Sequence, residues 1–264
     1  MLEAPLPDLR RAARIAFFTG AGLSAESGIA TYRGADGVWQ RYRYEDYACQ
    51  LAFRRDPARV WEFHDARRAD VAAAAPNAAH RLIAAIQAAR PDTAIVTQNI
   101  DGLHQAAGAR DVIELHGSLW RLRCEVCGAR AENRETPLAD KRCACGAWWR
   151  PDLVWFEDPL DGHRFEAAAA AIAACDCLVA IGTSALVYPA AELPMLAFRA
   201  PAGGRAAALT IEINPEETPL SRFYDHCLRG SASAMLAALW PAGGSGSGGD
   251  AEARGGQAGT GAGQ

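Results

Sequence analysis

Residues 14–19 read RIAFFT and run directly into Gly20-Ala21-Gly22. A short apolar run that ends in a tight glycine turn is typical of a buried first strand in a nucleotide-binding α/β domain. Four later runs share this form, each apolar and followed by a polar or glycine-containing turn. They are residues 93–97 (TAIVT), 112–115 (VIEL), 177–181 (CLVAI) and 208–213 (ALTIEI). We expect these five runs to be strands.

Alanine-rich stretches with helical spacing lie between these runs, at residues 77–89, 164–174 and 190–199. Strands that alternate with helices predict a parallel sheet with helices on both faces, which is a doubly wound, Rossmann-like α/β fold. Ligands of such sheets gather at the carboxyl ends of the strands. The residues just after each run are therefore the first candidates for a functional site.

Two segments interrupt the alternation. Residues 36–75 are rich in Arg, Tyr and Trp without strand signals and predict a helical insertion, while residues 119–151 carry four cysteines and predict a small zinc-binding domain. The Rossmann-like domain is then expected in three parts, at residues 1–35, 76–118 and 152–240. Residues 241–264 are almost wholly Gly, Ala, Ser and polar, which cannot offset the entropy of ordering, so we predict a disordered tail.

The bulk composition narrows the class of protein. The chain has 264 residues, half of them hydrophobic, which is enough to bury a full core. The net charge is −4 and the basic residues are scattered, so no nucleic-acid partner is expected. No apolar run approaches the roughly 20 residues that would span a bilayer, and the N-terminus lacks a signal-peptide pattern. We expect a soluble, cytoplasmic protein; the sequence leaves the oligomeric state open, with a monomer plausible.

Four of the eight cysteines stand in one window, as Cys124-x2-Cys127, fifteen intervening residues and Cys143-x-Cys145. Two close pairs of thiolates suit tetrahedral zinc, and four closed ligand positions make the ion structural. Two disulfides or four free thiols are the alternatives, but they fit the clustering and a reducing compartment less well. A zinc ribbon that binds nucleic acid is a further alternative, although the window is not notably basic.

The glycine loop alone is weak support for nucleotide binding, and the acidic residue that an ordinary dehydrogenase carries about twenty positions further on is absent. The longer stretch at residues 20–34, GAGLSAESGIATYRG, closely resembles the sirtuin signature GAGxSxESGIPTFRG. The stretches at four other strand ends also resemble sirtuin motifs. They are residues 97–104 (TQNIDGLH), 116–118 (HGS), 182–190 (GTSALVYPA) and 214–216 (NPE). The resemblance covers residues 13–239 and includes the zinc window.

The resemblance implies an NAD-dependent protein-lysine deacylase that produces nicotinamide, O-acyl-ADP-ribose and free lysine. His116 is the expected catalytic base, since its ordinary pKa lies near neutrality and it follows a strand; a structural histidine bonded to a main-chain carbonyl is the alternative. By resemblance, NAD contacts are expected at Gly20, Ala21, Gly22, Ser24, Glu26, Thr31, Arg33, Trp39, Gln98, Asn99, Ile100, Asp101, Gly182, Thr183, Ser184, Asn214, Pro215, Glu216 and Ala232. Without it, Asp101 is a helix N-cap and Asn214 a turn residue.

The substrate side also follows from the resemblance. Val154, Trp155 and Phe156 resemble the edge at which the family pairs with a substrate peptide by β-augmentation, although Glu157-Asp158 replaces the family's Gly-Glu.

Residues 61–68, WEFHDARR, are similar to the FYxxRR stretch of the subclass that removes succinyl and malonyl groups. Arg67 is present, and His64 stands at the Tyr position. We expect acidic acyl groups to be accepted, with His64 donating a hydrogen bond and adding charge when protonated. Ala35 supports a roomy acyl pocket. In the alternative, Arg67 only pairs with a nearby acid on its helix.

Two other functions compete with deacylation. A mono-ADP-ribosyltransferase would use the same NAD site without an acylated lysine. A catalytically silent, NAD-sensing zinc-ribbon module would bind partners only, but His116, Asn99 and Asp101 argue against it.

Overall fold

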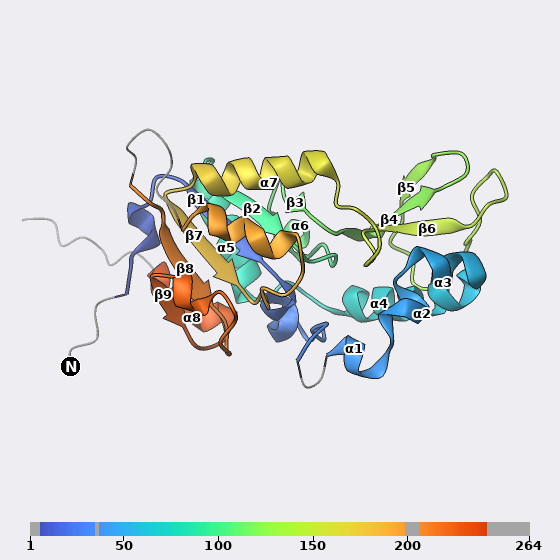
Figure 1. The fold of residues 1–264 in the computed structure, drawn as a ribbon, viewed down its shortest axis with the longest axis horizontal. Helices are drawn as coiled ribbons and strands as arrows, with labels where there is room; N and C mark the ends of the chain where they lie inside the picture. The colour runs from blue at the N-terminus through green and yellow to red at the C-terminus, as the bar shows by residue number, and fades with distance from the viewer. Residues whose placement is uncertain (1–5, 35–36, 199–205, 242–264) are drawn as a thin grey trace, which may run out of the picture.

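The computed structural model describes residues 6–34, 37–198 and 206–241 (Figure 1). Ala35 and nearly all of the predicted tail therefore lie outside the described residues. Within the described part, a six-stranded parallel sheet has the order β3-β2-β1-β7-β8-β9. Its strands are β1 (Ile15–Thr19), β2 (Ala94–Thr97), β3 (Ile113–Glu114), β7 (Cys177–Ile181), β8 (Leu209–Ile213) and β9 (His226–Leu228). The five predicted strands are confirmed, and β9 was not predicted.

Helices cover both faces of this sheet, so the doubly wound fold is confirmed. Ile15 and Phe17 of β1 pack with α5 (Ala78–Ala89) and α8 (Ala232–Leu239), while Ala16 and Phe18 point to the other face. That face is covered by α7 (Gly162–Ala174), which runs along one side of the sheet in Figure 1, and by the 3-10 helix η3 (Ala190–Leu196). Alternate side chains of each buried strand thus enter different cores.

The ends of the helices follow capping rules. Asn77 accepts hydrogen bonds from the main chain of Ala79 and His80 at the start of α5, and Asp161 and Ser231 cap α7 and α8 in the same way. Residues 190–199, expected as an ordinary helix, form the shorter η3, which contains Pro194. A proline there cannot donate to a preceding carbonyl, which disfavours an α-helix.

Residues 38–73 are helical, as expected of the insertion. They form α1 (Val38–Arg41), α2 (Tyr44–Tyr47), α3 (Gln50–Arg55) and the long α4 (Pro57–Ala73). Shorter elements elsewhere are η1 (Leu9–Arg11), η2 (Ala21–Ser27), α6 (Leu103–Ala106) and η4 (Ser221–Phe223).

A second, antiparallel sheet has the order β5-β4-β6 and lies beside these helices, away from β8 and β9 (Figure 1). Its strands are β4 (Gly117–Cys124), β5 (Arg130–Glu132) and β6 (Trp149–Leu153). Trp61 of α4, Leu122 of β4 and Leu153 of β6 share a third core, separate from the two beside the parallel sheet. β4 begins directly after His116, so the two sheets meet at that residue. The exact domain limits stay a prediction.

None of the helices in the described ranges is long and apolar enough to span a membrane.

Candidate active site

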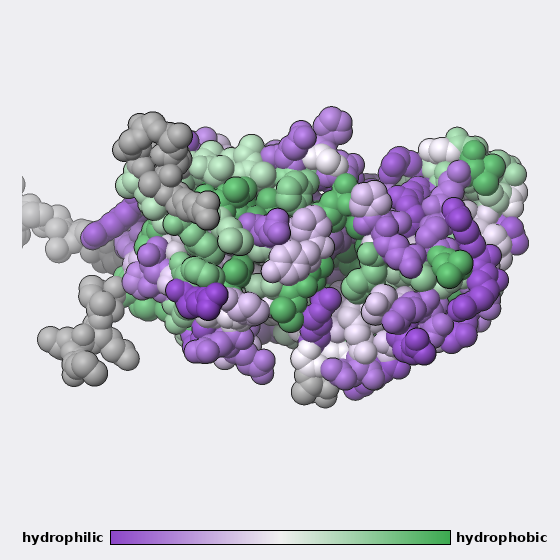
Figure 2. Space-filling model, in the orientation of Figure 1, coloured by the Kyte–Doolittle hydropathy of each residue, from purple (hydrophilic) through white to green (hydrophobic). Residues whose placement is uncertain are grey.

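A cavity of about 600 Å³ lies between the carboxyl ends of the parallel strands and the small sheet with its helices. Figure 2 shows the surface hollowed between these two parts. Most of the predicted site residues line this one cavity. They are Gly20, Ala21, Gly22, Thr31, Arg33, Trp39, His64, Arg67, Gln98, Asn99, Ile100, His116, Val154, Trp155, Phe156, Gly182, Thr183, Ser184, Asn214, Pro215 and Glu216.

Four predicted NAD contacts lie outside this lining. Ser24 and Asp101 are buried behind Asn99, while Glu26 accepts a hydrogen bond from the Ser233 N–H in the first turn of α8. Ala232 starts that helix and packs into the sheet core. In this structure Glu26 therefore joins η2 to the first turn of α8.

The glycines hold two loops together. A Cβ atom on Gly20 would lie 2.7 Å from the main-chain oxygen of Gly182, and one on Gly22 would lie 2.6 Å from the Cα of Gly182. Gly182 itself has φ +62, a conformation that side chains disfavour. From the sequence, the glycine loop was interpreted only as support for nucleotide binding. The structure shows a further reason for these glycines, which is the contact between the loops after β1 and β7.

His116 is partly buried and oriented by the main chain. Its Nδ1 lies 3.0 Å from the Gln98 carbonyl oxygen, to which a protonated Nδ1 donates. Burial lowers the pKa of His116 below its ordinary 6.5, so the ring is neutral at pH 7. Nε2 is then left without a proton and can accept one. The alternative interpretation, a structural histidine bonded to a main-chain carbonyl, is thus met by Nδ1 alone. Nε2 stays available to accept a proton.

A buried polar cluster supports the floor of the cavity. The Asn99 amide donates to the Gly20 carbonyl at 3.1 Å and to Ser24 Oγ at 3.3 Å, and Ser24 donates to Asp101 at 2.7 Å. Asp101 also accepts from the Leu103 N–H at 2.8 Å, at the start of α6. Burial raises the pKa of Asp101. The N-cap of α6 is Gly102 rather than Asp101, but Asp101 still accepts an N–H of the first turn and belongs to the network that fixes Asn99.

Two residues that the sequence did not single out hold the loop after β8. The carboxylate of Glu212, only 1% exposed, accepts from Arg229 at 2.7 Å. Arg229 also donates to the main-chain oxygens of Asn214 and Glu216, at 3.3 and 3.1 Å. Asn214 in turn donates to the Thr183 carbonyl at 2.8 Å. This chain of contacts fixes one wall of the cavity from behind, and only tertiary structure reveals it.

Replacing Arg229 by alanine is expected to raise the KM for NAD about tenfold and to change kcat less than threefold, because the loop loses its anchor while the reacting atoms keep theirs. The buried Glu212 would also lose its counter-charge, which lowers the melting temperature by several degrees. Arg222→Ala, which removes an exposed arginine nearby, is the control. Equal NAD constants in both variants would contradict the assignment.

The far end of the cavity carries His64 and Arg67. The His64 ring stacks on Trp155, with the ring centroids 6.0 Å apart. Neither ring nitrogen of His64 has a hydrogen-bond partner in the described structure. The main chain of Tyr47 lies close to the ring and acts to raise its pKa. Burial nevertheless lowers the pKa of His64 to about 3. The expectation that this ring adds charge is therefore not supported near neutral pH, while its capacity to donate a hydrogen bond is retained.

The predicted peptide edge is already hydrogen-bonded within the chain. The Val154 N–H donates to the His116 carbonyl at 3.0 Å, and the Phe156 N–H donates to a main-chain oxygen of the helical insertion at 3.3 Å. The Trp155 N–H donates to Asp158 at 3.1 Å. A peptide that joined this edge would therefore have to donate its own N–H groups to the carbonyl oxygens.

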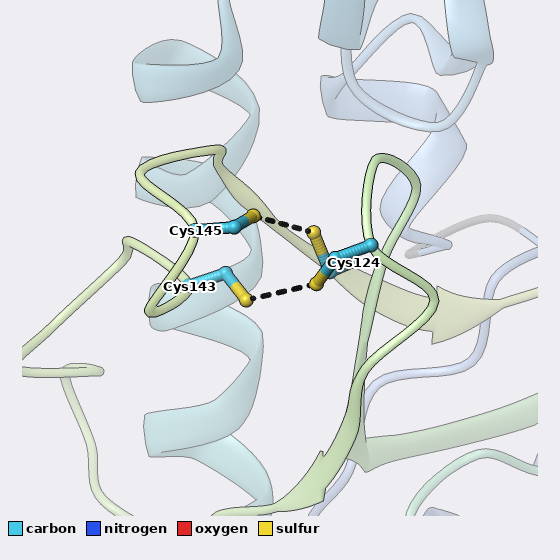
Figure 3. Close-up of side chains that lie close together, drawn as sticks. Cys124, Cys143 and Cys145 are labelled. Carbon is cyan, nitrogen blue, oxygen red and sulfur yellow. Dashed lines mark hydrogen bonds between the residues drawn. The ribbon is translucent and has the colours of Figure 1, made fainter.

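The four cysteines of the window converge (Figure 3). The Sγ atoms of Cys124 and Cys145 are 3.5 Å apart, as are those of Cys127 and Cys143, and all four lie within 4.8 Å of one another. Tetrahedral zinc with Zn–S bonds of about 2.3 Å places its sulfurs about 3.8 Å apart. The cluster fits one structural zinc ion, and the cysteines are not joined as disulfides.

The cavity also has lining residues that the sequence did not assign to the site. Tyr32 and Phe63 belong to an aromatic group around Trp39, with ring centroids 5.6 and 5.9 Å from the Trp39 ring. Leu186 and Tyr188 are 54% and 70% exposed on the facing loop. Leu186 and Tyr188 lie within the quoted stretch at residues 182–190, where no chemical signal in the sequence singles them out.

Comparisons with known proteins agree with this geometry. Residues 20–189 match the Sir2 family. An NAD-dependent protein deacylase of Caldanaerobacter subterraneus subsp. tengcongensis is 46% identical over 207 residues, which are 77% of this chain and 83% of that protein. One of Aquifex aeolicus is 41% identical over 225 residues, or 84% and 92% of the two chains.

Solved structures are similar as well. A Sir2 homologue–NAD complex has a TM-score of 0.79 and 39% identity, covering 88% of this chain and 89% of that one. A Sir2–p53 peptide–NAD+ complex has a TM-score of 0.73 and 26% identity, covering 86% and 92%. This chain belongs to the Sir2 family.

Proposed function

We propose that this chain is an NAD-dependent protein deacylase, which removes acyl groups from lysine side chains. The observation that carries the proposal is His116, oriented by the Gln98 carbonyl and placed where the two sheets meet, in the same cavity as the glycine loop and Arg67. Relatives that are 41–46% identical are named NAD-dependent protein deacylases. The protein then acts on acyl-lysine proteins or peptides, and in the cytoplasm, where thiols stay reduced.

The residues present fit NAD. Gly20 and Gly22 border the cavity without side chains, Asn99 and Gln98 line it with amide groups, and the loop after β8 lines the cavity as well. Bound NAD would supply a ribose that accepts the acyl group as nicotinamide leaves. The protein's own part is to orient that ribose and to receive a proton at Nε2 of His116, which is neutral at pH 7.

The acyl group is proposed to reach the far end of the cavity, where Arg67 and the neutral His64 stand. Arg67 supplies a guanidinium that can bind a carboxylate, and His64 supplies a buried hydrogen-bond donor. Removal of acetyl groups is the core activity proposed, with succinyl and malonyl groups accepted in addition.

Arg67→Ala is expected to lower kcat/KM for succinyl-lysine about 10- to 100-fold and to leave acetyl-lysine within about threefold, since only the acidic acyl group loses a charge-assisted hydrogen bond. Rates on matched peptides give the comparison. If both substrates lost activity equally, Arg67 would have a structural role only.

Mass spectrometry of reactions with NAD tests the function itself. An acetyl-lysine peptide should yield nicotinamide, O-acetyl-ADP-ribose and the free lysine peptide, and the unmodified peptide should yield none of them. ADP-ribose attached to the unmodified peptide would indicate the transferase instead. Binding of NAD without any product, from any acyl peptide, would indicate the silent module.

A further inference from the structure

Helix α4 places three polar side chains in a row, at His64, Arg67 and Asp70. Residues three apart on a helix are neighbours on one face. His64 is 3% exposed and Arg67 is 7% exposed, and both line the cavity. Asp70 is the outermost of the three, with a side chain that is 59% exposed. The row therefore leads from the buried end of the cavity to solvent.

Arg67 already has an acidic partner. Its Nη1 donates to Asp70 at 3.0 Å, and its guanidinium carbon lies 5.7 Å from the centre of the Tyr32 ring. Its Nε is buried without a hydrogen-bond partner in the described structure. The guanidinium of Arg67 thus forms an ion pair through Nη1 and keeps an unused hydrogen-bond donor at Nε.

The neighbouring charges on α4 have partners of their own. Arg68 donates to main-chain oxygens of Leu119 and Glu135, and Asp65 pairs with Lys141 at 2.8 Å. His64 carries no charge near pH 7. Arg67 and Asp70 thus form an ion pair whose charges sum to zero, while Arg68, held by neutral main-chain oxygens, keeps its positive charge behind that pair.

We propose that Asp70 is a specificity-determining residue, which competes with an acidic acyl group for Arg67 and so favours neutral acyl groups such as acetyl. The inference rests on the proposed deacylase function. An acyl carboxylate bound to Arg67 would share one guanidinium with Asp70, and two like charges at that separation repel. An acetyl group meets no such repulsion. Because Asp70 is largely exposed, solvent and salt screen the effect.

The test compares succinyl-lysine and acetyl-lysine peptides of one sequence. In Asp70→Asn the ratio of kcat/KM for succinyl over acetyl should rise about tenfold, with the gain shrinking as salt is added. Glu62→Gln removes an exposed carboxylate from the same helix and is the matched control, with an unchanged ratio. In the double variant Asp70→Asn/Arg67→Ala the gain should disappear, because the freed guanidinium is absent.

Three outcomes of these measurements would overturn the proposal. A ratio that falls in Asp70→Asn would show that Asp70 orients Arg67 for acidic groups, and a ratio that does not move would show that the pair is inert; either overturns the proposal. A gain that persists without Arg67 would also overturn it. Failure of the proposed function looks different, since the wild-type chain would then turn over neither peptide.

Discussion

His116→Ala is expected to lower kcat for acyl-lysine removal by about 10²- to 10⁴-fold, which is the usual contribution of a positioned general base. The Nδ1–H of His116 is held by the Gln98 carbonyl, so Nε2 is the nitrogen that can take up a proton. Alanine removes that nitrogen and leaves the fold of β4 intact. The rate of O-acyl-ADP-ribose formation measures the loss.

The control is His163→Ala, which removes an exposed histidine at the start of α7. It should change kcat less than twofold, and both variants should keep the wild-type melting temperature within a few degrees. Should His116→Ala retain full rates of product formation, His116 would be the structural histidine of the alternative interpretation, and the base would have to be sought among other lining residues.

The pH dependence follows from the direction of the pKa shift. Only the neutral ring can accept a proton, and burial lowers the pKa of His116 below 6.5. The acid limb of kcat/KM should therefore lie below pH 6.5, and activity should be independent of His116 ionisation above that value. In His116→Ala the limb should vanish from the residual rate. A limb centred above pH 7 in the wild type would contradict the assignment.

Much of the fold was predictable because burial on both faces of a parallel sheet leaves short, continuous apolar runs. β1 shows this most clearly, since Ile15 and Phe17 enter one core and Ala16 and Phe18 the other. Edge strand β9 has only three residues and no apolar run, so local sequence could not reveal it. Its pairing with β8 depends on tertiary structure.

Some residues of the site could likewise be predicted from the sequence, and others could not. Residues that follow parallel strands meet at one sheet edge by geometry, so Gln98, His116 and Thr183 could be placed together in advance. The Arg67–Asp70 pair was foreseen only as a generic alternative, because the sequence does not show which way the guanidinium turns. The contact between Glu212 and Arg229 joins β8 to the residue that follows β9, and local sequence could not reveal it.

Removing zinc is expected to have the largest effect on the fold. Chelation, or Cys143→Ser, should lower the melting temperature by about 10 °C or more and abolish deacylation. The binding of a structural zinc ion stabilises isolated zinc-finger peptides by about 10–16 kcal/mol of folding free energy. Removing the ion from this protein should cost part of such a stabilisation and so lower the melting temperature. The two cysteine loops face each other across the cluster, so a bound ion would tie them together in addition to the pairing of β4 with β6 (Figure 3). Cys227→Ser, at an exposed cysteine of β9, is the control and should change neither property.

The loss of structure after zinc removal should be confined to the small sheet and the helical insertion. The core that Trp61, Leu122 and Leu153 share is separate from the two cores of the parallel sheet. Unfolding without metal should therefore proceed in two steps, and tryptophan fluorescence should report the first, because Trp61, Trp120, Trp148, Trp149 and Trp155 all belong to this core or pack on it. Activity fails at that first step, since α4 carries Arg67 and β4 begins beside His116. A single transition at the wild-type temperature after complete removal of zinc would show that the ion has no structural role.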